Sequence, residues 1–160
     1  MTRLSSRHTV RTRGFTLLEI LLVVAAIAIL AGIVIVAINP AQQLADTRDA
    51  QRRSDVDSLA SAISQYVIKH GSFPSDLPSS DGTCSGKSDV SAYGICAEDA
   101  SCSTGFSLDA ELVTEGFIAG IPSDPSEDNA DYSGYSAFKD GNRVTVCAPL
   151  AENDTISSKR

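Results

Sequence analysis

The sequence predicts an α+β fold in which a long N-terminal helix precedes a small antiparallel β-sheet. Residues 15–38 are almost wholly apolar, and the polar segment that follows keeps a helical spacing of its apolar residues. Beyond residue 71 the chain is rich in Ser, Gly, Asp and Pro, and a clear strand pattern occurs only over residues 132–147. An order of helix first and strands last is typical of α+β domains.

The length and charge of the chain exclude several functions. Its 160 residues suit one small domain with attachments and are too few for a barrel enzyme. The net charge is −7, and we expect no nucleic-acid binding by the chain itself, because proteins that bind phosphates need basic clusters. His8 and His70 are its two histidines, and no pair of a nucleophile and a base can be identified in the sequence. We therefore expect a non-enzymatic protein without catalytic residues.

The N-terminal segment has the pattern of a membrane anchor. Residues 1–14 contain four arginines and no acid, and the apolar run begins at Phe15. A secretory signal could be cut after the small residues 26–28, but the run continues ten residues further, which disfavours ordinary signal cleavage. The 19 uncharged residues 20–38 are long enough to span a bilayer. The basic flank predicts a cytoplasmic N-terminus and an exported C-terminal part.

Glu19 interrupts this apolar run near its start. A carboxylate close to hydrocarbon is costly, and Glu19 is therefore a candidate functional residue. The alternative is that Glu19 lies at the level of the lipid headgroups, in a first helical turn where the helix dipole favours an anion.

The chain carries the segment Arg13-Gly14-Phe15-Thr16-Leu17-Leu18-Glu19, and an apolar run follows it. This pattern resembles the type IV pilin-like superfamily, whose prepilins and pseudopilins have class III signal peptides. The resemblance covers roughly the first 70 residues. It implies that a prepilin peptidase cuts between Gly14 and Phe15 and then N-methylates Phe15. Removing the four leader arginines from a chain of net charge −7 leaves −11. The resemblance also implies that Glu19 of one subunit meets the Phe15 amine of a neighbour, since a buried charge needs a partner.

The function implied by the resemblance is that of a structural subunit of a type IV pilus or pilus-like filament. The alternatives are a pseudopilin of a type II secretion system and, less favoured, a single-pass membrane protein that displays an extracellular binding domain. The implied partners are copies of itself and other pilins, the prepilin peptidase and the membrane. We expect a single-pass protein of the cytoplasmic membrane before assembly and a periplasmic or extracellular filament afterwards. The choice between pilus, competence and secretion filaments stays open.

A second helical segment follows the apolar run. Asn39 could cap a new helix with Pro40 at its first position, or one helix could continue and kink at Pro40. The helix should end at His70-Gly71, and its apolar face is formed by regularly spaced residues. These are Val56, Leu59, Ala60, Ile63 and Val67. The mixed charges of residues 48–57 predict a solvated face, with contact to neighbouring subunits as the alternative.

These observations divide the chain into four parts. They are a cleaved basic leader (1–14), a transmembrane and filament-core helix (15–39), its amphipathic continuation (40–71) and a small exported α+β domain (72–160). Within the last part we expect an irregular region (72–104), a short helix (108–117), a turn (121–125) and a hairpin of strands 132–138 and 143–147. Alternation in the final strand predicts that it is half-buried.

The four cysteines all follow the apolar run, and they form no C-x-x-C motif that would suggest zinc. Export to an oxidising compartment makes disulfides the expectation. Of the three possible pairings we expect Cys84–Cys96 and Cys102–Cys147, the second tying the final strand to the loop region.

Two further motifs extend the resemblance to pseudopilins. Gly71-Ser72-Phe73-Pro74 and Ile121-Pro122-Ser123-Asp124-Pro125 match patterns that recur in them. The major pseudopilin of type II secretion has a calcium site in the loop that follows. Asp124, Asp128 and Asp131 are the corresponding calcium candidates, but we favour an acidic solvated loop and expect no cofactor.

Overall fold

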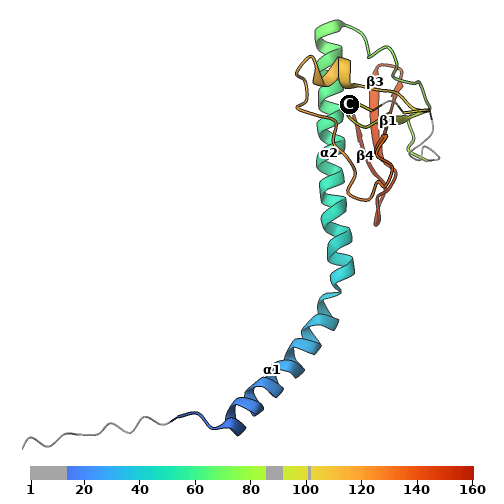
Figure 1. Cartoon of the computed structure of the whole chain (residues 1–160). Helices are drawn as coiled ribbons and strands as arrows, with labels where there is room; N and C mark the ends of the chain where they lie inside the picture. The colour runs from blue at the N-terminus through green and yellow to red at the C-terminus, as the bar shows by residue number, and fades with distance from the viewer. Residues whose placement is uncertain (1–13, 86–91, 101) are drawn as a thin grey trace, which may run out of the picture. The chain divides into compact units, whose positions relative to one another are not determined.

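The structure is a computed structural model that describes residues 14–85, 92–100 and 102–160. The predicted leader (1–14) lies outside the described residues except for Gly14. The chain divides into two compact units, one ending at Pro40 and the other spanning Ala41–Arg160. The fold is α+β, as predicted: an apolar N-terminal helix and a second helix precede an antiparallel sheet (Figure 1). The sheet has four strands, and two disulfides are present.

The N-terminal unit contains helix α1, Leu17–Ile38. Its apolar residues are good helix formers, and its last residue is followed by Asn39 with a φ of 47°, in the left-handed region that Asn tolerates. Helix α2, Pro40–His70, then begins with proline at its first position, where a missing N–H leaves no bond unmade. Of the two alternatives for this segment, the structure has the new helix, with Asn39 as the C-cap of α1.

Helix α2 ends at His70, as the sequence predicts. Gly71 follows with a φ of +74°, and its N–H bonds to the carbonyl of Val67 at 2.8 Å. The predicted apolar face is confirmed, because Val56, Leu59, Ala60 and Ile63 are buried and Val67 packs against them.

The sheet has the strand order β1-β2-β3-β4, and every neighbouring pair is antiparallel. Its strands are β1 (Gly94–Cys96), β2 (Tyr132–Asp140), β3 (Arg143–Ala148) and β4 (Ile156–Lys159). The predicted hairpin is confirmed, with Asp140 opposite Arg143 and a turn at Gly141. Strand β1 lies in the region expected to be irregular, because its three residues are too few to show an alternation of apolar and polar residues. Strand β4 was not predicted, because its sequence Ile-Ser-Ser-Lys has almost no such alternation.

The core lies between α2 and the sheet. Strand residues Tyr135, Ala137, Val144 and Val146 pack with the apolar face of α2 in one cluster. The prediction of a half-buried final strand is wrong, since β3 is buried over five successive residues. One reason is covalent: Cys147, which alternation would direct away from the core, is bonded to Cys84 of the preceding loop.

The short helix expected over residues 108–117 is a five-residue π-helical turn, η1 (Asp109–Val113). Leu112 inserts into the core, and the turn stops before Gly116, which adopts a φ of +79°. The segment is therefore shorter than its apolar pattern suggests.

The predicted cysteine pairing is wrong. The structure joins Cys84 to Cys147 and Cys96 to Cys102, with Cα–Cα distances of 5.8 and 5.7 Å. The physical reason is the unpredicted strand β1, which places Cys96 next to the start of β2 and beside the short loop that returns to Cys102. Cys147 in β3 is thereby left for Cys84.

The two disulfides should contribute unequally to stability. Cys84–Cys147 closes 63 residues and Cys96–Cys102 closes 6, for which chain entropy gives about 4 and about 2 kcal/mol. We expect the pair Cys84→Ser/Cys147→Ser to lower the free energy of unfolding more than Cys96→Ser/Cys102→Ser, as measured by denaturant titration. Peptide mapping without reduction checks the pairing, and a Cys102–Cys147 peptide would contradict it.

Candidate functional site

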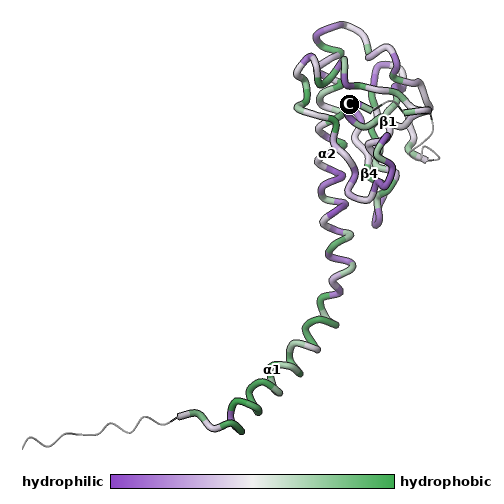
Figure 2. Tube along the Cα trace, viewed as in Figure 1, coloured by the Kyte–Doolittle hydropathy of each residue, from purple (hydrophilic) through white to green (hydrophobic). Residues whose placement is uncertain are grey.

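Helix α1 exposes an apolar surface on all sides. None of its residues is buried, and the green of hydrophobic residues runs along most of the helix (Figure 2). It is long and apolar enough to cross a membrane, the only helix of that kind among the residues described. Its 22 residues extend about 33 Å, close to the thickness of a hydrocarbon core. This surface cannot remain in water and needs lipid or other apolar helices around it.

The first turn of α1 is organised around Thr16 and Glu19. The Thr16 hydroxyl accepts a hydrogen bond from the Glu19 N–H at 3.2 Å and so caps the helix. Thr-x-x-Glu is the spacing of a capping box, a signal that our reading of the sequence did not use. The cap fixes Glu19 as the one acid of the first turn, at the positive end of the helix dipole.

Gly14 and Phe15 precede this cap in extended, exposed backbone. Phe15 is 79% exposed, and a side chain added to Gly14 would meet nothing within 4 Å. The bond between them is therefore sterically accessible. The predicted processing residues, Gly14 and Phe15, lie five and four residues before Glu19 in the sequence.

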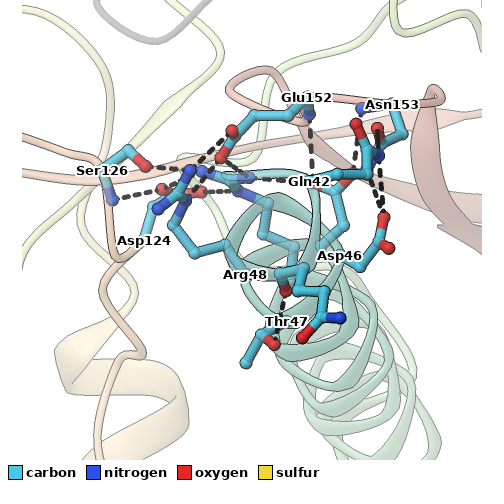
Figure 3. Close-up of polar contacts among 11 residues, drawn as sticks. Gln42, Asp46, Thr47, Arg48, Asp124, Ser126, Glu152 and Asn153 are labelled. Carbon is cyan, nitrogen blue, oxygen red and sulfur yellow. Dashed lines mark hydrogen bonds and ion pairs between the residues drawn. The ribbon is translucent and has the colours of Figure 1, made fainter. Parts of the chain in front are cut away.

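A second polar site lies in the C-terminal unit, where α2 meets two loops of the sheet (Figure 3). Arg52 of α2 has no exposed side-chain surface. Its Nε and Nη2 donate to the two oxygens of Asp124 at 2.7 and 2.9 Å, and its Nη1 donates to Asp49 at 2.8 Å. Ser126 and Glu152 accept the remaining two N–H groups, so all five guanidinium donors are satisfied. The hydrogen bond to Asp124 raises the pKa of Arg52 above its usual range.

Asp124 reaches Arg52 because its loop lies very close to β2. Its N–H bonds to the carbonyl of Ser133 at 2.8 Å. A Cβ on Gly134 would approach the Cβ of Asp124 to 2.5 Å, and Gly134 has a φ of +80°. Glycine at this position is therefore required for the loop to approach the strand.

Asp49 anchors the loop between β3 and β4. It accepts hydrogen bonds from the backbone N–H groups of Glu152 and Asn153 at 3.0 Å and from the Asn153 side chain at 3.0 Å. Burial would raise the pKa of Asp49, but these amide bonds and the Arg52 guanidinium outweigh it and lower the pKa to about 2. Arg48 adds a bidentate pair to Glu152 at 2.6 and 2.7 Å.

The prediction that residues 48–57 form a solvated face is therefore wrong in part. Arg53 and Asp57 are exposed, but Asp49 and Arg52 are buried. The partner of Asp49 on the helix is Arg52, at i+3. The deciding partner, Asp124, is 72 residues away and left no local signal.

The three calcium candidates are not brought together. Both oxygens of Asp124 bond to Arg52, while Asp128 and Asp131 are exposed. No cluster of three or more His, Cys, Asp or Glu side chains suited to a metal occurs in the part of the chain that the structure describes. His70 lies in the last turn of α2, where its ring nitrogen is 2.7 Å from Glu115.

Comparison with known proteins gives a partial match. The chain is 38% identical over 65 residues to the type II secretion system core protein G of Pectobacterium carotovorum subsp. carotovorum. The match covers 41% of this chain and spans 40% of the length of that curated relative. No family model and no solved structure matches. Together with the fold, this partial similarity supports a relationship to the pilin-like superfamily.

Arg52 is expected to be a main determinant of the stability of the C-terminal unit. Arg52→Leu leaves Asp49 and Asp124 buried without their cation, and removing one partner of a buried pair typically costs about 3–5 kcal/mol. Arg52→Lys keeps the charge but loses the planar fork, so we expect a smaller loss. Urea unfolding of the detergent-solubilised full chain measures both changes.

The matched control is Arg53→Leu, on the same helix but exposed, with an expected change within about 0.5 kcal/mol. Acid titration gives an independent check. Because the folded pKa of Asp49 is about 2 against an ordinary 3.8, its contribution to stability is complete above pH 4 and is lost as the pH falls towards 2. Equal stability of the two leucine variants would show that the buried cluster contributes nothing.

Proposed function

We propose that this chain is a structural subunit of a pilus-like filament, released from its leader by a prepilin peptidase and assembled through its N-terminal helix. The observation that carries the proposal is α1, an apolar helix with no buried residue and a single carboxylate, Glu19, in its first turn. A catalytic role is not needed to explain any part of the described geometry.

The exposed apolar surface of α1 suits both proposed locations of the chain, the membrane before assembly and the filament afterwards. Its length suits a bilayer before assembly, with a cytoplasmic N-terminus and an exported C-terminal unit. The same surface can pack against copies of itself after assembly, because apolar helices bury equally well against lipid or against one another. Cleavage at Gly14–Phe15 would leave this helix on the mature protein, unlike ordinary signal cleavage.

Glu19 has a specific role in this proposal. Cleavage creates an ammonium on Phe15, four residues before Glu19, and N-methylation would keep its charge. The Thr16 cap uses the backbone N–H of Glu19 and not its carboxylate, so a neighbouring copy can supply the ammonium that neutralises this carboxylate. Such a pair would fix the axial position of one subunit relative to the next.

Among filament types, we favour a pseudopilin of a type II secretion system. The support is the partial similarity to a protein named as a core component of such a system. The competing function is a membrane-anchored extracellular binding domain. It would explain α1 but gives no purpose to Gly14, Phe15 and Glu19 together.

Processing at Gly14 separates these functions. We expect a mature chain of 146 residues that starts with N-methylated Phe15, which is the full length less the 14-residue leader. Gly14→Val should block the cut, because the proposed peptidase needs a minimal side chain at that position. Intact-mass measurement of the membrane fraction decides it, with Gly32→Val, inside α1, as the control that should still be cut. An uncut parent chain would favour the membrane-anchored binding domain.

Glu19→Ala should leave export and cleavage intact but strongly reduce assembly. Losing one member of a buried pair leaves the Phe15 ammonium uncompensated, typically at about 3–5 kcal/mol, and the loss recurs at every subunit. Glu19→Asp should do partial damage because its side chain is shorter. The measurement is the yield of sheared filament relative to cleaved subunit in membranes, with Asp57→Ala, at an exposed acid of α2, as control. Normal assembly of Glu19→Ala subunits would rule out the pairing.

A further inference from the structure

The charges of the sheet loops are segregated between the two ends of the strands. Because β1 and β3 run antiparallel to β2, the loops after β1, before β2 and between β3 and β4 meet at one end of the sheet. The turn between β2 and β3 and the end of β4 meet at the other. Asp131 and Lys139 mark these ends and are separated along the strand by about 26 Å.

The loops at the first end carry acids and no Lys or Arg. They are residues 97–100, 124–131 and 149–155, with eight Asp or Glu in total. Asp124 and Glu152 are paired with Arg52 and Arg48, which leaves six acids without a cation from α2. These six are Glu98, Asp99, Glu127, Asp128, Asp131 and Asp154. We call this surface the acidic end.

The opposite end of the strands is basic. Lys139 is the penultimate residue of β2, Arg143 begins β3, Lys159 ends β4 and Arg160 follows it. Arg160 pairs with Val144, the neighbour of Arg143 in β3, through both backbone groups, and the side chains of Arg143 and Arg160 are both exposed. Lys159 bonds to Asp140 at 2.9 Å, whereas Arg143 and Arg160 have no carboxylate partner among the described residues. We call this surface the basic end.

Both ends are fixed along α2, which belongs to the same compact unit. The acidic end is held at the first half of α2 through Asp49 and Arg52. The basic end lies at the other extremity, because Lys139 and Gly141 share a surface hollow with Val67 and Gly71. The charge separation therefore runs along the axis of α2.

We propose that the basic end of one copy of this chain docks against the acidic end of the next copy along the filament. The inference rests on the proposed function, since a filament of parallel N-terminal helices orients every copy the same way. Two different surfaces that meet head to tail generate an open assembly, whereas a twofold contact would close after two copies. The complementary charges select this orientation and disfavour contacts between like ends.

Charge reversal tests the contact on the full chain in assembling cells. Arg143→Glu/Arg160→Glu reverses the basic end, and Glu98→Lys/Asp154→Lys reverses the acidic end, all at exposed positions outside the Arg52 cluster. We expect each pair to reduce sheared filament by about tenfold, because like charges then face each other, and we expect the four changes together to restore most of the yield. Asp57→Lys, exposed on α2 between the ends, is the control for net charge and should assemble normally.

Zero-length carbodiimide cross-linking supplies a readout that needs no substitution. Lys139 of one copy should join Glu98, Asp128, Asp131 or Asp154 of another in filaments but not in detergent-solubilised monomers. The length of β2 separates Lys139 from Asp131 within one copy, so such links report contacts between copies. The pair Lys159–Asp140 should cross-link in both samples as the internal control.

The outcomes separate the two proposals. Normal yield from both reversals, no restoration by the fourfold change, or filaments without these cross-links overturns the head-to-tail contact and leaves the filament function standing. Absence of any filament from the cleaved parent chain overturns the filament function and the contact with it.

Discussion

One guanidinium connects the second helix to two loops at one end of the central strands. Arg52 is buried in α2 and bonds directly to the loop before β2 and to the loop after β3. A buried arginine is tolerated only when its charge and its donors are matched, and here each donor has an acceptor. The helix, the hairpin and the two loops must therefore come together in one arrangement. The apolar core packs α2 on the sheet, but the Arg52 cluster specifies which turn of α2 lies at which end of the strands.

The two units of the chain differ in how their apolar residues are removed from water. The C-terminal unit buries its own apolar residues, and two disulfides stabilise it. Helix α1 of the N-terminal unit has no buried residue, so its stability depends on lipid or on other apolar helices. Asn39, a single residue in the left-handed conformation, lies between the exposed helix α1 and helix α2. A sequence change in α1 should therefore alter assembly without altering the fold of residues 41–160.

The features that the sequence predicted are those with a local cause. Helix α1, the stop at Gly71 and the turn at Gly141 each follow from neighbouring residues, and so would the Thr16 cap if its spacing with Glu19 had been used. The burial of Arg52 and the pairing of Cys84 with Cys147 depend on contacts 72 and 63 residues apart, for which periodicity carries no information. Strand β1 could not be predicted because three residues within a Ser- and Gly-rich region carry no alternation, and without it the pairing of Cys96 could not be inferred. The proposed processing and assembly residues, Gly14, Phe15 and Glu19, are predicted by a motif and not by their structural surroundings.

The long-range disulfide also has a mechanical consequence. If the chain is pulled at α1 and at its last strand, the load passes from Cys84 to Cys147 through the covalent bridge. The 63-residue stretch that the bridge closes is then shielded from the force. Without the bridge, that stretch could unfold and extend to a length of about 210 Å. The bridge therefore limits how far the C-terminal unit can extend under tension, which would keep it short in any structure that transmits force.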